Sequence, residues 1–249
     1  VDLDLPHGGA RHVAALTKAL ARQGHRVTLL AVGGGAIDGV RRPAIPHVPP
    51  GARREAVLAT FAAKEALLSR PDVAYVRISP TTSAIAAVLG AARIPVVLEL
   101  NGPVLEELGR RQRPPAAIEL VRQALRLVVK GARHLVAASE NIAEHARQEL
   151  GAQEITVLDN GVDLEVAKPG DRALAKAFFG LPEGPRFVVL VGTLVPELRL
   201  DLLAEAHRRL PGVGLMVVGD GPGAEYVQAM QVAARPSSPV LFAGAVPHE

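Results

Sequence analysis

The 249-residue sequence contains no cysteine and no tryptophan, and only 3% of its residues are aromatic. Without cysteine, the chain can form no disulfide bond, no thiolate zinc site and no cysteine nucleophile. This composition fits a reducing compartment, and we expect a cytoplasmic protein. Hydrophobic residues still make up 49% of the chain, so the predicted core is aliphatic and built from Ala, Val, Leu and Ile.

Long apolar runs and strong charge are also missing. No segment approaches the roughly 18–20 apolar residues of a membrane span, and the first residues lack the pattern of a signal peptide. The formal net charge is only +3, and basic pairs such as Arg41-Arg42 and Arg110-Arg111 are scattered. A nucleic-acid-binding protein usually shows a denser basic stripe with aromatic residues, so we expect no nucleic-acid partner. Scattered arginine pairs are compatible with peripheral contact to anionic lipids on the inner face of a membrane.

Several catalytic motifs are absent as well. The eight histidines form no HExxH motif and no pair spaced by four residues, so we expect no metal site. The sequence contains neither a GxSxG elbow nor a GxxxxGK[ST] loop. These absences argue against serine hydrolases and P-loop NTPases.

What the chain does have is a regular alternation of apolar runs and helical patterns. In the first part, strands are predicted over residues 1–5, 25–32, 72–78, 94–100, 134–138 and 154–158. Helices are predicted over 9–23, 53–69, 82–92 and 140–150, and a longer amphipathic stretch to residue 131 is broken at Pro114-Pro115. Residues 33–50 are rich in Gly and Pro and predict a loop. This alternation predicts a doubly wound parallel sheet of the α/β class.

Periodicity is lost over residues 159–185 and then returns. Strands are predicted over 187–191, 214–218 and 240–243, and helices over 199–210 and 224–234. We therefore predict two Rossmann-like domains, at 1–165 and 186–249, joined by a linker region at 166–185. The second holds about half the elements of such a domain, so we expect it to be incomplete and the chain to be cut at both ends.

Three glycine-rich turns follow predicted strands. Gly8-Gly9 opens a predicted helix, whose free N–H groups and positive dipole end could face a phosphate, although a tight strand–helix turn would look the same. Gly33-Gly34-Gly35 precedes no helix and predicts a flexible loop. The Gly219-Asp220-Gly221-Pro222 turn falls at the carboxyl edge of the second sheet, where such sheets bind ligands.

These motifs occur in an order that resembles a known family. The segments that carry the resemblance are 8–32, 71–84, 94–108, 134–163, 187–222 and 240–249. The most specific are Asn160-Gly161-Val162-Asp163 and the VVGDGP run at 217–222. Together they resemble the retaining, nucleotide-sugar-dependent glycosyltransferases of family 4, which have two facing Rossmann-like domains, the GT-B architecture.

The resemblance implies transfer of a sugar from a nucleoside diphosphate to an acceptor hydroxyl, with retention of anomeric configuration. The donor would be a substrate, and no cofactor or metal is implied; the acceptor would be a glycan, a lipid or a small molecule. Asn101 stands where many members carry a histidine near the donor sugar, and we take it as the candidate catalytic residue. The residues implied to bind the donor diphosphate or nucleotide are Gly8, Gly9, Gly192, Thr193, Arg199, Gly219, Asp220, Val246 and Pro247.

The sequence also departs from the family pattern. Members usually carry an Arg directly after the glycine of the first strand of the second domain and a Lys about five residues later. Here these positions are Thr193 and Leu198, and Arg199 is the nearest cation. The family's E-x7-E motif should lie beyond Glu249, so we expect this chain alone to be inactive.

Two other classes remain open. Loss of the two cations suits a non-catalytic relative that binds a nucleotide sugar or a glycan. A Rossmann-like dehydrogenase would need GxGxxG with an acidic residue about 20 positions later, and the turn at Gly8-Gly9 does not supply that spacing.

Overall fold

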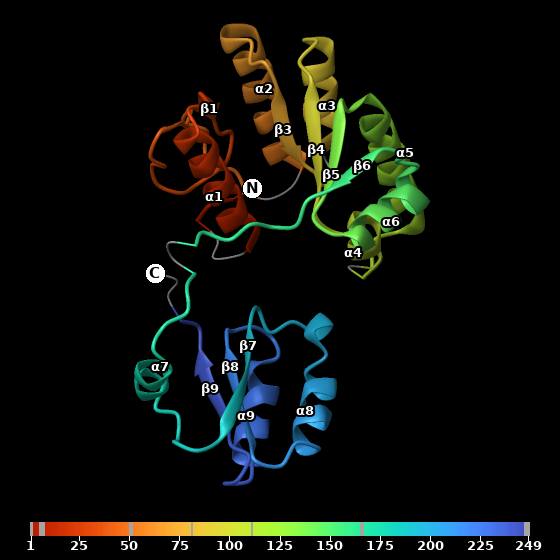
Figure 1. The fold of residues 1–249 in the computed structure, drawn as a ribbon. Helices are drawn as coiled ribbons and strands as arrows, with labels where there is room; N and C mark the ends of the chain where they lie inside the picture. Colours follow the sequence, from red (N-terminus) through yellow and green to blue (C-terminus); the bar gives the residue numbers. More distant parts are fainter. Residues whose placement is uncertain are drawn as a thin grey trace. The chain divides into compact units, whose positions relative to one another are not determined.

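The structure is a computed structural model that describes residues 2–4, 8–49, 52–80, 82–110, 112–164 and 167–246. It divides into two compact units, Val1–Asp163 and Leu164–Glu249 (Figure 1). Each unit contains an open sheet of parallel strands with helical crossovers. The α/β class predicted from the alternation is therefore confirmed.

The main sheet of the first unit has four strands. In spatial order they are β3 (Ala74–Arg77), β4 (Val96–Leu100), β5 (His134–Ala137) and β6 (Ile155–Val157). Each strand pairs in parallel with the next one along the chain, and the register places Glu99 between Arg77 and Val136. Parallel neighbours need long crossovers, which the intervening helices supply.

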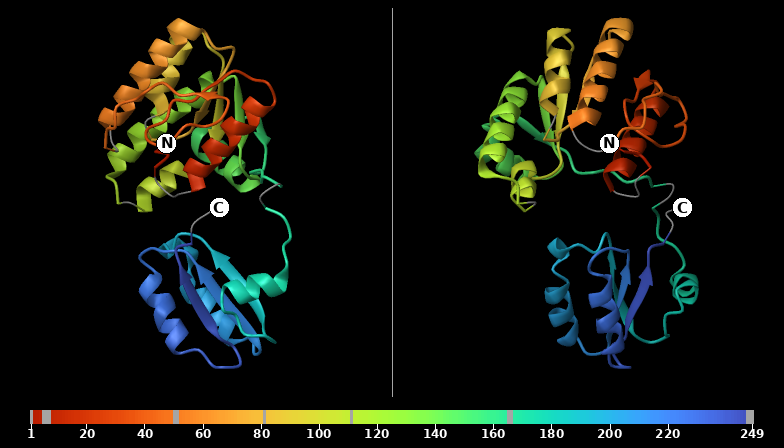
Figure 2. Two further views of the ribbon diagram at one scale, coloured as in Figure 1. Left: turned by 90° about the vertical axis from the view of Figure 1, so that its left-hand side faces the viewer. Right: turned by 180° about the vertical axis from the view of Figure 1, so that it is seen from behind.

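Helices form a row beside this sheet (Figure 2). They are α2 (Ala52–Ser69), α3 (Thr82–Ala91), α4 (Val104–Arg110), α5 (Pro115–Gly131) and α6 (Glu140–Leu150). The predicted break at Pro114-Pro115 separates α4 from α5, and Pro115 lies in the first turn of α5, where its missing N–H costs no hydrogen bond. The Ser139 hydroxyl caps α6 by accepting from the Ile142 N–H, and Gly151 ends that helix at φ 70°.

The core of the first unit lies between this sheet and its helices. Leu98 and Leu100 of β4 are buried against Leu125 of α5 and Ala143 of α6. Successive strand residues point to opposite faces, so Glu99 points to the other face of the sheet. That face is the one from which α1 (Gly8–Arg22) reaches the sheet, because His12 of α1 contacts Glu99.

The region before α2 differs from the prediction. Only two short parallel strands form there, β1 (Val27–Thr28) and β2 (Val40–Arg41). The strand predicted over 25–32 is reduced to β1 and one parallel bridge between Val32 and Asp2, and within the described residues that bridge is all that forms of the strand predicted over 1–5. The predicted loop over 33–50 in turn contains β2. Gly39 lies directly before β2 and Pro43 lies two residues after it, so this strand stays short and the ladder stops after two residues.

The Gly33-Gly34-Gly35 turn is held by polar contacts. The Arg42 guanidinium donates to the carbonyls of all three glycines, and the Gly34 N–H donates to Asp4 Oδ1 at 2.6 Å. Gly33 and Gly34 adopt φ values of 66° and 75°, which favour glycine. The expectation of a flexible loop overlooks these contacts, because Arg42 is seven to nine residues away and Asp4 is 30 residues away in the sequence.

A buried ion pair ties the N-terminal segment to α2. Arg54 Nη2 lies 3.0 Å from Asp2 Oδ2, and both side chains are less than one tenth exposed. Burial acts to raise the pKa of Asp2, but hydrogen bonds from the Asp4 N–H and the Arg54 guanidinium outweigh it and lower the pKa from 3.8. The ionised pair therefore stabilises the fold above pH 3.8 and loses this contribution on acidification.

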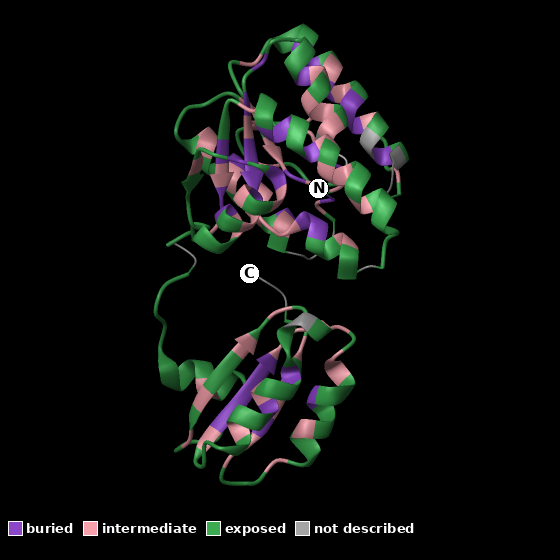
Figure 3. Cartoon of the chain, turned by 90° about the vertical axis from the view of Figure 1, so that its right-hand side faces the viewer, coloured by how far each residue is buried: buried purple, intermediate pink, exposed green. Residues whose placement is uncertain are grey.

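The second unit has three parallel strands. In spatial order they are β7 (Arg186–Val191), β8 (Val213–Val218) and β9 (Val240–Gly244). The helices between them are α8 (Leu200–Arg208) and α9 (Ala224–Val232), and the short η1 (Pro196–Leu198) precedes α8. The central strand β8 is the most buried (Figure 3), with Leu215 and Val217 packed against Leu200 and Val227 of the two helices.

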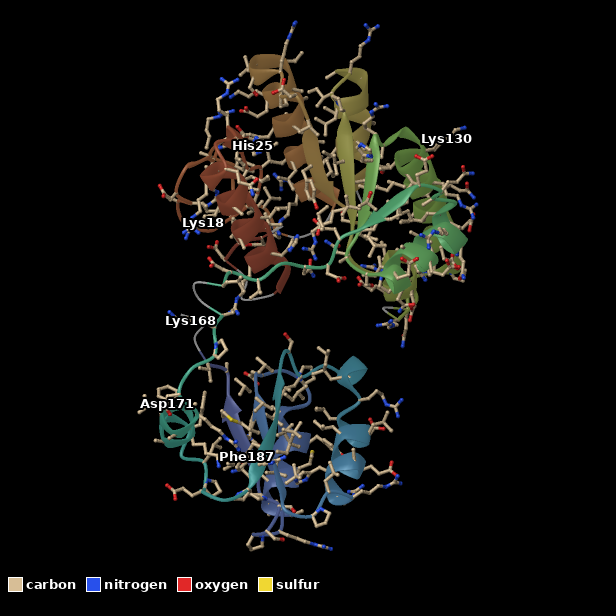
Figure 4. All side chains as sticks on the ribbon, viewed as in Figure 1. Lys18, His25, Lys130, Lys168, Asp171 and Phe187 are labelled. Atoms are coloured by element: carbon tan, nitrogen blue, oxygen red, sulfur yellow. The ribbon has the colours of Figure 1, made fainter. Side chains whose placement is uncertain are left out.

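A further helix, α7 (Arg172–Phe178), lies inside the region predicted as an irregular linker. Asp171 caps it by accepting from the N–H groups of Ala173 and Leu174. The Nζ atom of Lys176 lies 5.9 Å from the ring centroid of Phe187, and this contact connects the helix to the sheet. Figure 4 labels Phe187 on β7 and Asp171 beside α7. Periodicity did not predict this short helix because the residues around it are rich in Gly and Pro.

Substitution of Arg54 by Met should destabilise the first unit. It leaves the Asp2 carboxylate buried without its cation, which typically costs about 3–5 kcal/mol. Urea unfolding of the full-length protein at pH 7 measures the loss. The matched control is Arg53→Met, on the exposed side of the same helix, with an expected effect within about 0.5 kcal/mol. Equal losses for the two variants would contradict a stabilising role of the buried pair.

Candidate functional site

In the second unit, the loops that follow β7 and β8 pack directly against each other. The Gly192 N–H donates to the Val218 carbonyl at 3.0 Å, and the Leu194 N–H donates to the Asp220 carbonyl at 2.9 Å. A Cβ atom on Gly219 would lie 1.8 Å from the Gly192 carbonyl oxygen. Only glycine permits this approach, and Gly219 also has a φ of 141°.

The contact continues into the start of α9. A Cβ atom on Gly221, which has a φ of 146°, would lie 2.8 Å from the Leu194 carbonyl oxygen. That same carbonyl accepts from the Gly223 N–H at 2.8 Å, and Asp220 Oδ1 accepts from the Gly221 N–H at 2.7 Å. In the GDGP turn, main-chain atoms therefore pack directly against main-chain atoms of the loop that follows β7.

The structure brings together several of the predicted residues at this edge. Gly192 and Thr193 follow β7, Gly219 and Asp220 follow β8, and Val246 lies two residues after β9. Parallel strands end at the same edge of a sheet, and this edge is where open α/β sheets bind ligands. Thr193 and Asp220 are exposed there. Pro247 lies outside the described residues.

Arg199 is placed differently from the prediction. It does not begin a regular helix from 199 to 210, because it lies between η1 and α8 with a left-handed φ of 49°. Its guanidinium is exposed and bonds to Asp201, with Nη2–Oδ2 at 2.7 Å and Nε–Oδ1 at 3.0 Å. Hydrogen bonding to Asp201 raises the pKa of Arg199, and the same pairing lowers the pKa of Asp201.

In the first unit, the predicted residues lie on two elements. Gly8 and Gly9 are the first two residues of α1, at the end where backbone N–H groups are free of helical partners. Asn101 is the first residue after β4, and its Nδ2 atom is buried with no hydrogen-bond partner among the described residues. Asp163, from the motif at 160–163, has its Oδ2 atom 3.9 Å from Nη1 of Arg22 near the end of α1.

A buried carboxylate links these two elements. Glu99 of β4 is 3% exposed, and its Oε1 lies 2.8 Å from His12 Nε2 of α1. The approach lacks the alignment of a good hydrogen bond, and Glu99 Oε2 has no partner in the described part of the chain. Burial, together with the charge of Glu99, raises the pKa of Tyr75 on β3 to about 12.

His12 and Glu99 are not among the site residues predicted from the sequence. A signal was present, because Glu99 is the one charged residue in the apolar run VVLEL of β4. A lone carboxylate in a buried strand needs a partner, since a buried charge is costly when unpaired. His12 could not be identified as that partner without the packing of α1.

Within the described residues, no group of three or more His, Asp and Glu side chains could hold a metal ion. The same residues contain no helix whose length and hydropathy would let it cross a membrane.

The sequence of the first unit matches a known family of proteins. Residues 6–166, more than half of the chain, match the family model described as Glycosyltransferase Family 4. The chain therefore belongs to Glycosyltransferase Family 4.

A curated relative and two solved structures illustrate the similarity. D-inositol 3-phosphate glycosyltransferase of Mycobacteroides abscessus is 43% identical over 79 residues, which are 31% of this chain and 18% of that protein. HepE of Anabaena, solved with UDP-glucose, matches 98% of this chain and 67% of its own with a TM-score of 0.68 and 19% identity. Sucrose-phosphate synthase of Thermosynechococcus elongatus matches 97% and 66%, with a TM-score of 0.73 and 16% identity. At such identities the solved structures show the fold alone, which is GT-B.

Substitution of Gly219 by Ala should strongly destabilise the second unit. The added Cβ would collide with the Gly192 carbonyl oxygen, so we expect a loss of at least about 3 kcal/mol. Urea unfolding of the full-length protein measures it. Gly212→Ala is the matched control, because Gly212 has a φ of 76° but no atom within 4 Å of the added Cβ, and backbone strain alone costs about 1–2 kcal/mol. A loss no larger than that of the control would contradict the close packing of the two loops.

Proposed function

We propose that this chain is part of a glycosyltransferase that moves a sugar from a nucleoside-diphosphate sugar to an acceptor hydroxyl with retention of configuration. The observation that carries the proposal is the glycine-packed pair of loops after β7 and β8, together with membership of Glycosyltransferase Family 4. The chain spans only 18% of the curated relative described above. The proposal therefore concerns the full-length protein.

The proposed reaction depends more on stabilising the charges that develop on the sugar and the diphosphate than on a protein nucleophile. As the bond between the anomeric carbon and the phosphate oxygen breaks, positive charge develops on the sugar and negative charge on the departing diphosphate. Preorganised N–H groups and cations stabilise that charge best where water is excluded. Gly8 and Gly9 at the start of α1 offer such N–H groups, and the loops at Gly192-Thr193 and Gly219-Asp220 let a ligand approach the backbone.

The remaining predicted residues receive roles in the same proposal. The unpartnered Nδ2 of Asn101 could donate a hydrogen bond to a sugar hydroxyl. Val246 and Pro247 would lie against the nucleotide base, and Arg199 would supply a cation to the diphosphate. We propose that the reaction needs no metal or other cofactor, and that the protein is cytoplasmic with peripheral contact to the membrane.

The names of similar proteins suggest the first substrates to test. The Anabaena structure contains UDP-glucose, and the Mycobacteroides relative is named for D-inositol 3-phosphate. Incubation of the full-length protein with UDP-glucose and D-inositol 3-phosphate, with GDP- and ADP-sugars in parallel, should release the nucleoside diphosphate only when an acceptor is present. At least one nucleoside diphosphate should also raise the melting temperature. Protection without transfer would favour the non-catalytic binder, and absence of both would contradict the proposal.

Substitutions of Arg199 and Asp201 should change the affinity for the nucleoside diphosphate in opposite directions. If Arg199 binds the diphosphate, it must exchange Asp201 for phosphate oxygens. Arg199→Ala should then raise the Kd for the nucleoside diphosphate about 10-fold, which corresponds to one charge-assisted hydrogen bond. Asp201→Asn should lower that Kd, because it frees the guanidinium. Isothermal titration measures both values.

Arg209→Ala is the control for this titration, since Arg209 forms a similar exposed pair with Glu205 at the other end of α8. Its Kd should match that of the wild type. Unchanged binding in both Arg199→Ala and Asp201→Asn would show that the pair lies outside the donor site.

A further inference from the structure

The contact between His12 and Glu99 joins two elements that carry predicted site residues. Glu99 is 3% exposed, and its Oε1 lies 2.8 Å from His12 Nε2. The two atoms are within the distance of a polar contact, although their approach lacks the alignment of a good hydrogen bond. The contact joins α1 to β4, an inner strand of the sheet.

Its position along the chain is specific. His12 lies one helical turn after Gly8 at the start of α1, and Asn101 lies two residues after Glu99 at the end of β4. Asn101 is the first residue after β4, so the end of the strand connects it directly to Glu99. The contact thus links the first turns of α1 to the residue that follows β4.

Stability alone does not account for this pair. A buried polar contact is often no more stabilising than apolar side chains of similar volume, because both polar groups lose hydration. The other strand residues near Glu99 on this face include Tyr75 and Arg77 on β3, and Arg77 is the register neighbour of Glu99. A polar contact between buried groups is directional, so it favours one position of α1 relative to β4. An apolar contact is not directional and would allow a wider range of positions.

We propose that His12 is a positioning residue, which acts through Glu99 to hold the Gly8-Gly9 turn and Asn101 at the spacing that the donor requires. The proposal rests on the proposed function. Removal of the contact should leave the fold largely intact and allow α1 to shift against β4. A displacement of about 1 Å remote from the reacting atoms can lower turnover by up to about 100-fold.

The test uses the full-length protein and the transfer assay described above. His12→Ala should lower kcat/KM for the donor by about 10- to 100-fold. His12→Gln should recover most of this loss, because the Gln amide can place an N–H close to the position of Nε2. In a Glu99→Ala background, His12→Ala should have little further effect, since residues that act as a unit are not additive.

Thr17→Ala is the matched control on α1. Thr17 is 8% exposed, and its hydroxyl bonds to the carbonyls of Val13 and Ala14, so the substitution weakens the same helix without touching Glu99. At a similar loss of melting temperature, this variant should keep kcat/KM within about 3-fold of the wild type, as expected of a site that acts only on stability. Equal losses in His12→Ala and Thr17→Ala would show that His12 is merely structural and would overturn the proposal.

Hydrogen exchange supplies a readout that does not depend on transfer. In His12→Ala, the amides of residues 8–12 and 98–102 should both exchange faster than in the wild type, whereas Thr17→Ala should affect α1 alone. Unchanged exchange over 98–102 would overturn the positioning role. If the wild-type protein neither transfers a sugar nor binds a nucleotide, the proposed function fails, and this exchange pattern still decides whether His12 holds α1 to β4.

Discussion

The close approach of Gly192 and Gly219 is the constraint on which the second unit depends. A carbonyl oxygen occupies the space where Gly219 would otherwise carry a side chain. The two loops can meet in this way because β7 and β8 pair in parallel and therefore end at one edge of the sheet. The same packing keeps bulky side chains away from the edge, so a ligand can come close to the main chain. The glycines are therefore required for the packing of the two loops. The proposed binding of a ligand depends on the open main chain that this packing leaves.

In the first unit, a polar contact joins a helix to the sheet. Its apolar core lies on one face of the sheet, where Leu98 and Leu100 meet the helices α5 and α6. On the other face, β4 carries a buried carboxylate instead, and α1 meets it through a histidine. An apolar interface tolerates small sliding movements, whereas a polar contact in a poorly hydrated environment has few favourable arrangements. Asn101, the proposed sugar-binding residue, follows directly after the strand that carries this contact.

Much of this fold could be predicted from the sequence, because periodicity reports burial. The strands β3 to β6 and the helices α3 and α6 lie where alternation and capping residues place them, with Ser139 and Gly151 as clear signals at the ends of α6. Contacts that form only in the folded chain could not be predicted, and they account for two of the errors: the Gly33–Gly35 turn is held by Arg42, and β2 forms only by pairing with β1. The helix α7, which has a local cap at Asp171, was missed because of the Gly and Pro residues around it. At the candidate site, the glycines could be found from spacing, but the pairing of His12 with Glu99 required the tertiary packing of α1.

At the proposed donor site, the negative charge of a diphosphate must be balanced, and Arg199 is the nearest cation in the sequence. A helix N-terminus contributes the equivalent of about half an elementary charge, whereas a diphosphate carries several charge equivalents. Thr193 and Leu198 provide no cation, so dipoles and N–H groups alone would leave much of that charge unbalanced. Arg199 is close in sequence, but Asp201 neutralises it in the structure. Exchange of one anion for another is inexpensive at an exposed pair, because water already screens both charges. In the proposed donor site, Arg199 would exchange Asp201 for phosphate oxygens, and an exposed ion pair permits this exchange at a lower cost than a buried one.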